Sequence, residues 1–326
     1  MIDFKSLLQS TSAFRAVSGD KASGRLSHAY LVLTKDGDNL GEYLKILASL
    51  IVCEEGDPCG VCRKCKLIKD GAFSDVLFYP KKGASVATEE VNELIEESYL
   101  KPIEGDKKVF VINQAQAMNT VAQNKLLKTL EEPPSGVHII LGATNEHALL
   151  STVKSRVKKL EIPSFSEEVL FSVLKEECPD KEKLSVAIAC GDGTVGGVKK
   201  LYGDERLKDI TDLALDLLVN MATSREVLEY SVKISKVSED VGEFISVLGL
   251  LLRDLLSINE GREDLAFNRK AVERLTEAQR FNRGAIIHAL EAVAEAQKRK
   301  RSNANATMLI EWLLFQILEG KYKWQK

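Results

Sequence analysis

The sequence predicts an α/β fold in its first half and an all-helical second half. Up to about residue 162, short apolar runs rich in β-branched residues alternate with segments of helical periodicity. That alternation, with short connections, is typical of a parallel sheet with helices on both faces. Pro163 then marks a break, and from about Leu207 onward the apolar spacing is helical with almost no proline.

The composition limits the classes of function. The chain has 326 residues, enough for two or three domains, with 44% hydrophobic and 29% charged residues. Its 45 basic and 48 acidic residues give a net charge of -3, so any contact with nucleic acid must use a local basic patch. No apolar run is long enough to span a bilayer and the start, MIDFKSLLQS, lacks a signal-peptide pattern, so we expect a cytoplasmic protein with no membrane partner.

The elements of the first half follow from local patterns. Phe4–Arg25 has helical spacing and predicts one or two helices. Strands are expected where short runs are largely apolar, at Ala29–Leu33, Asp75–Tyr79, Val109–Ile112 and Val137–Leu141. One last strand is expected at Lys159–Ile162. Amphipathic helices are expected between them, at Glu42–Val52, Val86–Leu100 and Asn119–Glu132. Thr88 is the expected N-cap of the second, and Pro133 stops the third.

The second half is expected to be helical throughout. Ser164 to about Leu201 predicts a small helical unit. Six longer helices with apolar faces follow, at Leu213–Val219, Val227–Val237, Val241–Ile258, Ala271–Arg280, Ala285–Ala296 and Thr307–Leu318. Asn303 and Asn305 are expected to cap the last of them.

Four of the six cysteines lie within thirteen positions and predict a metal site: Cys53, Cys59, Cys62 and Cys65. In a cytoplasmic chain this clustering favours a metal over disulfides. Four thiolates on tight turns can hold Zn²⁺ tetrahedrally, and a site filled by protein ligands is structural rather than catalytic. The alternative is a set of reduced cysteines without metal. Cys178 and Cys190 are expected to be ordinary thiols.

Several literal segments resemble the bacterial clamp-loader family of AAA+ proteins. They are LLKTLEEPP, then GATN, then Lys154-Ser155-Arg156. The resemblance implies an AAA+ domain at 1–163 with a zinc module at 53–65. It further implies a small helical lid domain at 164–208 and an oligomerising helical collar at 209–326.

The family's phosphate loop is degenerate here. Between Thr34 and Gly41 only Gly37 matches the loop pattern, and Leu40 stands where the phosphate-binding lysine belongs. Gly41 stands where the Mg²⁺-binding hydroxyl belongs. The loop also carries two acidic residues that would repel a triphosphate, Asp36 and Asp38. We therefore expect a plain surface turn at Lys35–Asn39 and no bound ATP.

The other two nucleotide elements are also missing. The Walker B acids of the family correspond here to Asn113 and Gln114, and a neutral amide neither holds Mg²⁺ by charge nor acts as a base. The second-sensor arginine corresponds to Gly196. The sequence thus predicts the frame of an ATPase without its chemistry.

Arg156, with Ser155, is the part of the family's machinery that remains. The pair resembles the Ser-Arg-Cys motif, with Val157 in place of the cysteine, and in the family that arginine reaches the ATP of a neighbouring subunit. An arginine suits this role because it is always charged and can fork onto two phosphate oxygens. The alternative is that Arg156 caps a helix or pairs with an acid.

The resemblance, with these expectations, implies a non-hydrolysing stator subunit of the DNA polymerase III clamp loader. Its expected partners are tau/gamma-type ATPase subunits, a delta-type clamp-opening subunit, and, through the complex, the sliding clamp and primed DNA. The alternatives are a divergent tau/gamma-type ATPase and a stand-alone zinc-bearing DNA-binding protein. The dense basic run Lys298–Arg301 is either a DNA contact or a solvated helix end.

Overall fold

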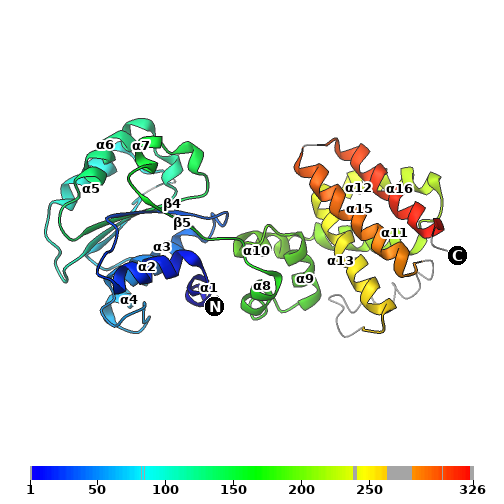
Figure 1. Ribbon diagram of the computed structural model, residues 1–326, viewed down its shortest axis with the longest axis horizontal. Helices are drawn as coiled ribbons and strands as arrows, with labels where there is room; N and C mark the ends of the chain where they lie inside the picture. The colour runs from blue at the N-terminus through cyan, green and yellow to red at the C-terminus, as the bar shows by residue number, and fades with distance from the viewer. Residues whose placement is uncertain are drawn as a thin grey trace. The chain divides into compact units, whose positions relative to one another are not determined.

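The computed structural model describes residues 2–81, 83, 85–237, 241–262, 281–302 and 304–323. The chain divides into two compact units, residues 1–165 and 166–326. The first contains a sheet covered by helices, and the described part of the second is helical (Figure 1). The predicted subdivision of the second unit near residue 208 stays a prediction.

The first unit is built on a five-stranded, all-parallel sheet in the order β2-β3-β4-β1-β5. The strands are β1 Ala29–Leu33, β2 Val76–Tyr79, β3 Lys108–Ile112, β4 Val137–Ala143 and β5 Lys158–Glu161. In register, Leu31 of β1 lies beside Leu141 of β4, and Leu141 lies beside Ile112 of β3. The predicted parallel sheet is confirmed.

Helices cover both faces of this sheet (Figure 1). One face carries α1 Phe4–Gln9, α2 Ser12–Ala22, α3 Leu40–Val52 and α4 Arg63–Lys69, and the other carries α5 Thr88–Ser98, α6 Thr120–Glu131 and α7 Ser151–Lys154. Along β1, Tyr30 and Val32 belong to the first core, while Ala29 and Leu31 belong to the second. Both faces are therefore apolar, which is why the inner strands β1, β3 and β4 are nearly continuous apolar runs rather than alternating ones.

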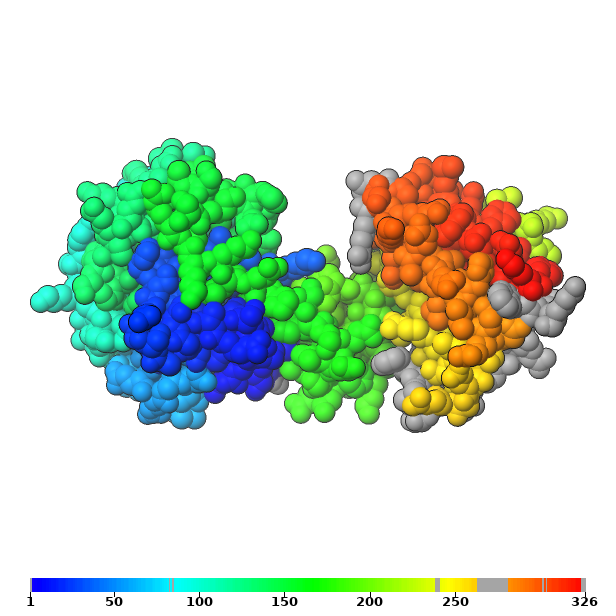
Figure 2. All heavy atoms as spheres, in the orientation of Figure 1, coloured from blue at the N-terminus to red at the C-terminus, as the bar shows by residue number. Residues whose placement is uncertain are grey.

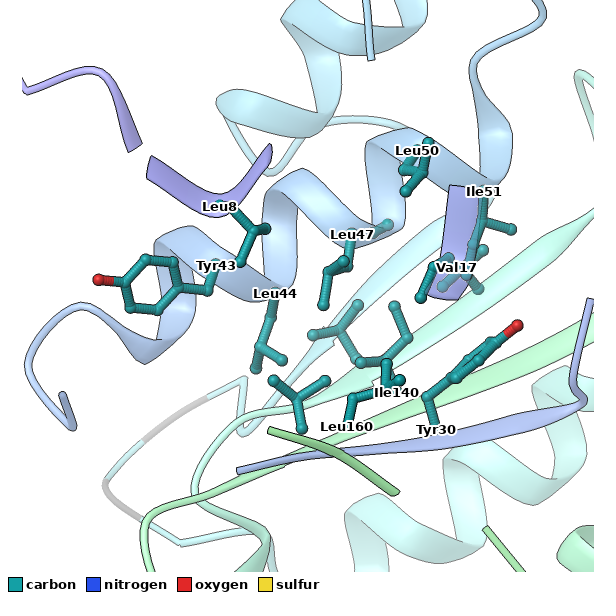
Figure 3. Close-up of a cluster of buried hydrophobic side chains, with 14 of the residues drawn as sticks. Leu8, Val17, Tyr30, Tyr43, Leu44, Leu47, Leu50, Ile51, Ile140 and Leu160 are labelled. Carbon is teal, nitrogen blue, oxygen red and sulfur yellow. The ribbon is translucent and has the colours of Figure 1, made fainter. Parts of the chain in front are cut away.

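Helix α3 supplies much of the first core. Figure 3 shows Leu44 and Leu47 of α3 directed toward Ile140 and Leu160 of the sheet. The close approach of α3 depends on Gly142 in β4, because a Cβ atom there would lie 2.6 Å from Leu44 Cδ1.

Several boundaries differ from the sequence expectation, and two of them lie at polar contacts. β2 starts at Val76 rather than Asp75, and the Asp75 carboxylate accepts hydrogen bonds from the backbone N–H groups of Ile103 and Glu104, both at 2.7 Å. α5 has Ala87 at its N-cap position rather than Thr88, and the Ala87 N–H donates to Glu90 at 3.0 Å. In both places a carboxylate accepts a hydrogen bond from a backbone N–H group at or near the boundary of the element.

The second unit consists of helices in its described residues. They are α8 Glu167–Leu174, α9 Lys181–Cys190, α10 Val195–Gly203, α11 Arg206–Asn220, α12 Ser224–Val237, α13 Val241–Asn259, α15 Arg283–Arg301 and α16 Ala306–Lys323. The predicted helix Ala271–Arg280 and the predicted cap Asn303 lie outside the described residues. Asn305 does cap α16, accepting from Met308 N at 3.1 Å. In the part of the chain that the structure covers, no helix is long and apolar enough to cross a membrane.

Replacing Gly142 with alanine should destabilise the first unit by about 1–3 kcal/mol, because the added methyl group enters the packed contact with Leu44. Hydrogen exchange of the β4 amides in each variant measures the change. Gly19→Ala in α2 is the matched control: nothing lies within 4 Å of its added Cβ, so it should stabilise by about 0.5–1 kcal/mol. Equal protection in the Gly142→Ala variant and the parent would contradict the packing argument.

Candidate functional site

The four clustered cysteines come together at one side of the first unit. Cys53 follows α3, Cys62 is the N-cap of α4, and Cys65 lies within α4. The four ligand sulfur atoms all lie within 4.8 Å of one another, and those of Cys59 and Cys65 are 3.9 Å apart. A tetrahedral zinc ion with Zn–S bonds of about 2.3 Å separates its sulfur atoms by about 3.8 Å. The four residues can therefore bind a metal ion, and the spacing is consistent with zinc.

Backbone donors and burial act on these thiols in opposite directions. Cys59 Sγ accepts from Cys62 N at 3.2 Å, and Cys62 Sγ accepts from Cys65 N at 3.4 Å. The N–H groups of Cys62 and Val61 lower the pKa of Cys59, because they stabilise its thiolate. Burial raises the pKa of Cys65 to about 12. A divalent cation in the cluster would supply the charge that keeps such a buried thiolate deprotonated.

The other two cysteines lie in the second unit, apart from the cluster. Cys178 is buried, and burial raises the pKa of its thiol. Cys190 donates to the carbonyl of Glu243 at 3.6 Å, and burial raises its pKa to about 12. Both groups are therefore protonated thiols at neutral pH.

The loop of residues 34–41, where the sequence predicts a degenerate phosphate loop, is packed with its own side chains. Asp36 is buried, and its carboxylate accepts from Asn39 Nδ2 at 2.9 Å and from the Tyr43 hydroxyl at 3.0 Å. Burial, with Asp36 adding to it, raises the pKa of Tyr43 far above its usual range, so the hydroxyl stays a donor. Leu40, in the place of the lysine, is fully buried in the core beneath α3.

The expectation of a plain surface turn at Lys35–Asn39 is wrong in part. Lys35 and Asp38 are exposed as expected, but Thr34 and Asp36 are buried. Thr34 Oγ1 accepts from Asp36 N at 3.1 Å, and a Cβ on Gly37 would lie 3.1 Å from Thr144 Cγ2. The loop is thus packed against the end of β4, since Thr144 follows that strand.

The amides in the Walker B place form a small polar cluster at the carboxyl ends of β3 and β4. Gln116 Nε2 donates to Gln114 Oε1 at 2.6 Å and to Thr144 Oγ1 at 3.1 Å. Gln114 adopts a left-handed backbone with φ of 58°. Asn113 Nδ2 would lie 3.6 Å from a Cβ on Gly41, and Asn113 Oδ1 is buried with no hydrogen-bond partner among the described residues. The sheet topology brings the loop of residues 34–41 and these amides together.

Arg156 lies at the end of α7, where Ser155 is the C-cap. Its Nη1 donates to the carbonyl oxygen of Thr152 at 2.9 Å and to Ser155 Oγ at 3.2 Å. Its Nη2 lies 2.5 Å from Oε1 of Glu131, the last residue of α6. In this chain the guanidinium therefore both caps a helix and pairs with an acid, while a third of the side chain stays exposed (33%).

The two lysines that follow Arg156 are engaged separately. Lys158 bonds to Asp20 at 2.6 and 2.7 Å, and Lys159 pairs with Glu146 at 2.8 Å. Arg156 therefore does not share its acid with them.

Sequence reasoning missed Glu131, the burial of Asp36, and Lys21. Lys21 of α2 donates to three backbone carbonyls beside the cysteine cluster. A signal for Lys21 was present, since it falls at helical spacing from the buried Phe14 and Val17. No comparable pattern connects Glu131 with Arg156, because that pairing depends on how α6 and α7 pack.

Residues 9–166 match the family model described as DNA polymerase III, delta subunit. A DNA polymerase III subunit delta′ of Bacillus subtilis (strain 168) is 28% identical over 308 residues, which cover 91% of this chain and 92% of that protein. A delta′ subunit of Yersinia pestis is 27% identical over 270 residues, which cover 78% of this chain and 77% of that protein. A solved gamma-subunit-related protein of Thermotoga maritima aligns with a TM-score of 0.42 and 17% identity, over 95% of this chain and 100% of that one.

Protein purified without chelator should contain about one zinc per chain, and Cys62→Ser should lose it, because one of the four thiolates is removed. Metal analysis by mass spectrometry measures both. Cys178→Ser, in the second unit, is the control and should keep its zinc. Less than about half a zinc per chain in the parent protein would count against a structural four-thiolate site.

Proposed function

The chain belongs to the delta-prime-like clamp-loader subunits of bacterial DNA polymerase III, and on that premise we propose that it is a non-hydrolysing stator that supplies Arg156 to a neighbouring ATPase subunit. The neighbours would be tau/gamma-type ATPase subunits and a delta-type clamp-opening subunit. The assembled complex would use ATP to place the sliding clamp on primed DNA during replication.

One observation carries the proposal: the chain's own side chains fill the place of the nucleotide phosphates, while the arginine remains at the surface. A phosphate loop needs clustered N–H donors and a lysine, but here the buried Asp36 carboxylate takes the local donors and Leu40 points into the core. The amides Asn113 and Gln114 add no charge to hold Mg²⁺. These features favour a non-hydrolysing subunit over the divergent ATPase.

To act on a neighbour's ATP, Arg156 must exchange Glu131 for a phosphate group. The ion pair is partly exposed, at 33% and 48% of the two side chains, and such pairs contribute about 0–1 kcal/mol. An arginine supplied in trans lowers a phosphoryl-transfer barrier by about 4–7 kcal/mol. The internal pair is thus weak enough to be displaced, and the Thr152 and Ser155 contacts can still orient the guanidinium.

The C-terminal helices offer an apolar surface for the proposed collar. α12 exposes Leu228 and Val232, one helical turn apart. α16 exposes Met308, Phe315 and Tyr322, which are spaced seven residues apart and so lie along one side of the helix. Phe315 and Tyr322 also line an open hollow of about 520 Å³ with residues 222–224. Exposed apolar side chains at helical spacing are typical of surfaces that pack against another helix.

The basic run gives little support to direct DNA binding. Arg299 pairs with Glu295 at 2.9 Å and stacks over the Trp312 ring at 4.0 Å from its centroid. Its guanidinium is therefore already used in holding α15 to α16. This contact and the net charge of -3 both make a stand-alone DNA-binding protein a weaker proposal than a clamp-loader subunit.

In a loader reconstituted with cognate subunits, clamp and primed DNA, Arg156→Ala should lower turnover at the ATP site it serves by about 10³-fold or more. The total steady-state rate of ATP hydrolysis by the loader would then fall by the fraction that this one site contributes. The chain alone should show no ATP hydrolysis. Hydrolysis by the chain alone would contradict the non-hydrolysing role, and equal rates with parent and variant would contradict the role of Arg156. Sedimentation of each complex verifies that assembly is unchanged.

Glu131→Gln is the matched variant for the same assay, because it removes the charge that holds Arg156 without touching the arginine. Turnover should stay within about fivefold of the parent, as expected for a half-exposed ion pair. A loss as large as that of Arg156→Ala would show that Arg156 acts only by pairing with Glu131.

The double variant Met308→Asp and Phe315→Asp should weaken association with the partner subunits at least about tenfold, because two apolar contacts are lost. Sedimentation velocity of mixtures measures it, and circular dichroism should show that the free chain keeps its helices. Thr307→Asp, at an exposed position of the same helix, is the control for added charge and should leave association unchanged. Normal assembly of the double variant would exclude this surface from the collar.

A further inference from the structure

Lys21 connects helix α2 to the loop that carries the first metal-ligating cysteine. Its ammonium group donates to the backbone carbonyls of Leu50 at 2.8 Å, of Cys53, and of Gly56 at 2.6 Å. The first carbonyl lies in the last turn of α3, and the other two lie in the loop that follows it. All three ammonium protons therefore form hydrogen bonds that hold the backbone around Cys53.

A second bond from α2 reaches the same loop. Ser18, one turn before Lys21, donates through its hydroxyl to Asp57 Oδ1 at 2.9 Å. Figures 1 and 2 show the cysteine-bearing segment, in light blue, directly beside the dark blue N-terminal helices. Residues 53–57 are thus held from outside the cysteine cluster by one face of one helix.

The charge of Lys21 also bears on the cluster. The Lys21 ammonium group bonds to the backbone carbonyl of Cys53, one of the two buried cysteines of the four. Four thiolates around a divalent ion carry a net charge of 2−, part of which lies in the protein interior. A cation held beside such a site offsets this charge, and its position is fixed here by the three carbonyls.

We propose that Lys21 is a positioning residue of the four-cysteine metal site, which fixes the backbone at Cys53 and offsets the charge of the metal-bound thiolates. Metal binding is then coupled to α2, a helix that contributes no ligand. Residues that orient metal ligands in this way typically change metal affinity by about 10–100-fold when they are replaced. The proposal does not depend on the clamp-loader assignment, because it concerns only the metal and the first unit.

The test is zinc affinity, measured by competition with a chromophoric chelator on the full-length chain. Lys21→Met, which keeps the length of the side chain and removes the ammonium group, should bind zinc about 10–100-fold more weakly than the parent. Lys21→Arg keeps the charge and should recover affinity to within about tenfold of the parent. Lys45→Met, a control on α3 that removes a surface ion pair with Glu42, should bind zinc like the parent.

A Lys21→Met chain with the zinc affinity of the parent would overturn the proposal. If that variant does not fold, the parent protein gives an independent answer through hydrogen exchange with and without zinc. Removal of zinc should speed exchange of the amides near the C-terminus of α2, while those of α5, on the other face of the sheet, should change little. Equal exchange in α2 with and without zinc would overturn the coupling.

Discussion

Two apolar cores lie on opposite faces of the central strands of the first unit, and the same strands contribute residues to both. Tyr30 and Val32 pack under α3, while Ala29 and Leu31 pack under α5 and α6, so that β1 is covered on both sides. Because every strand runs in the same direction, the segments that leave their carboxyl ends gather along one edge. Because of this shared direction, the loop of residues 34–41 lies beside the amide side chains of Asn113, Gln114 and Gln116.

The contacts that hold α3 and the loop before it on the sheet all lie within the protein. Packing of α3 on the sheet depends on Leu40, Leu44 and the missing side chain of Gly142, none of which needs a ligand. The loop before α3 is stabilised internally by the bonds of Asp36. Arg156 is held by a different pair of elements, α6 and α7, and its contacts with Glu131 and Thr152 do not involve the loop.

The sequence was sufficient for features that depend on local spacing. Continuous apolar runs predicted the parallel strands, and the spacing from Cys53 to Cys65 predicted a cluster whose sulfur atoms the fold does bring together. It was insufficient where a polar group finds a partner far along the chain. The burial of Asp36, the start of β2 at Val76 and the Glu131 partner of Arg156 each follow from tertiary contacts that no periodicity encodes.

The burial of Leu40 makes a lysine at that position costly. A lysine at that position would carry an ammonium group into a core that is fully excluded from water, at a cost of several kcal/mol or with loss of its proton. Replacing Asp36 first would leave the Tyr43 hydroxyl buried without its acceptor. Either single substitution therefore gives a less stable protein. The packing of one helix thus restricts which residues position 40 can hold without loss of stability.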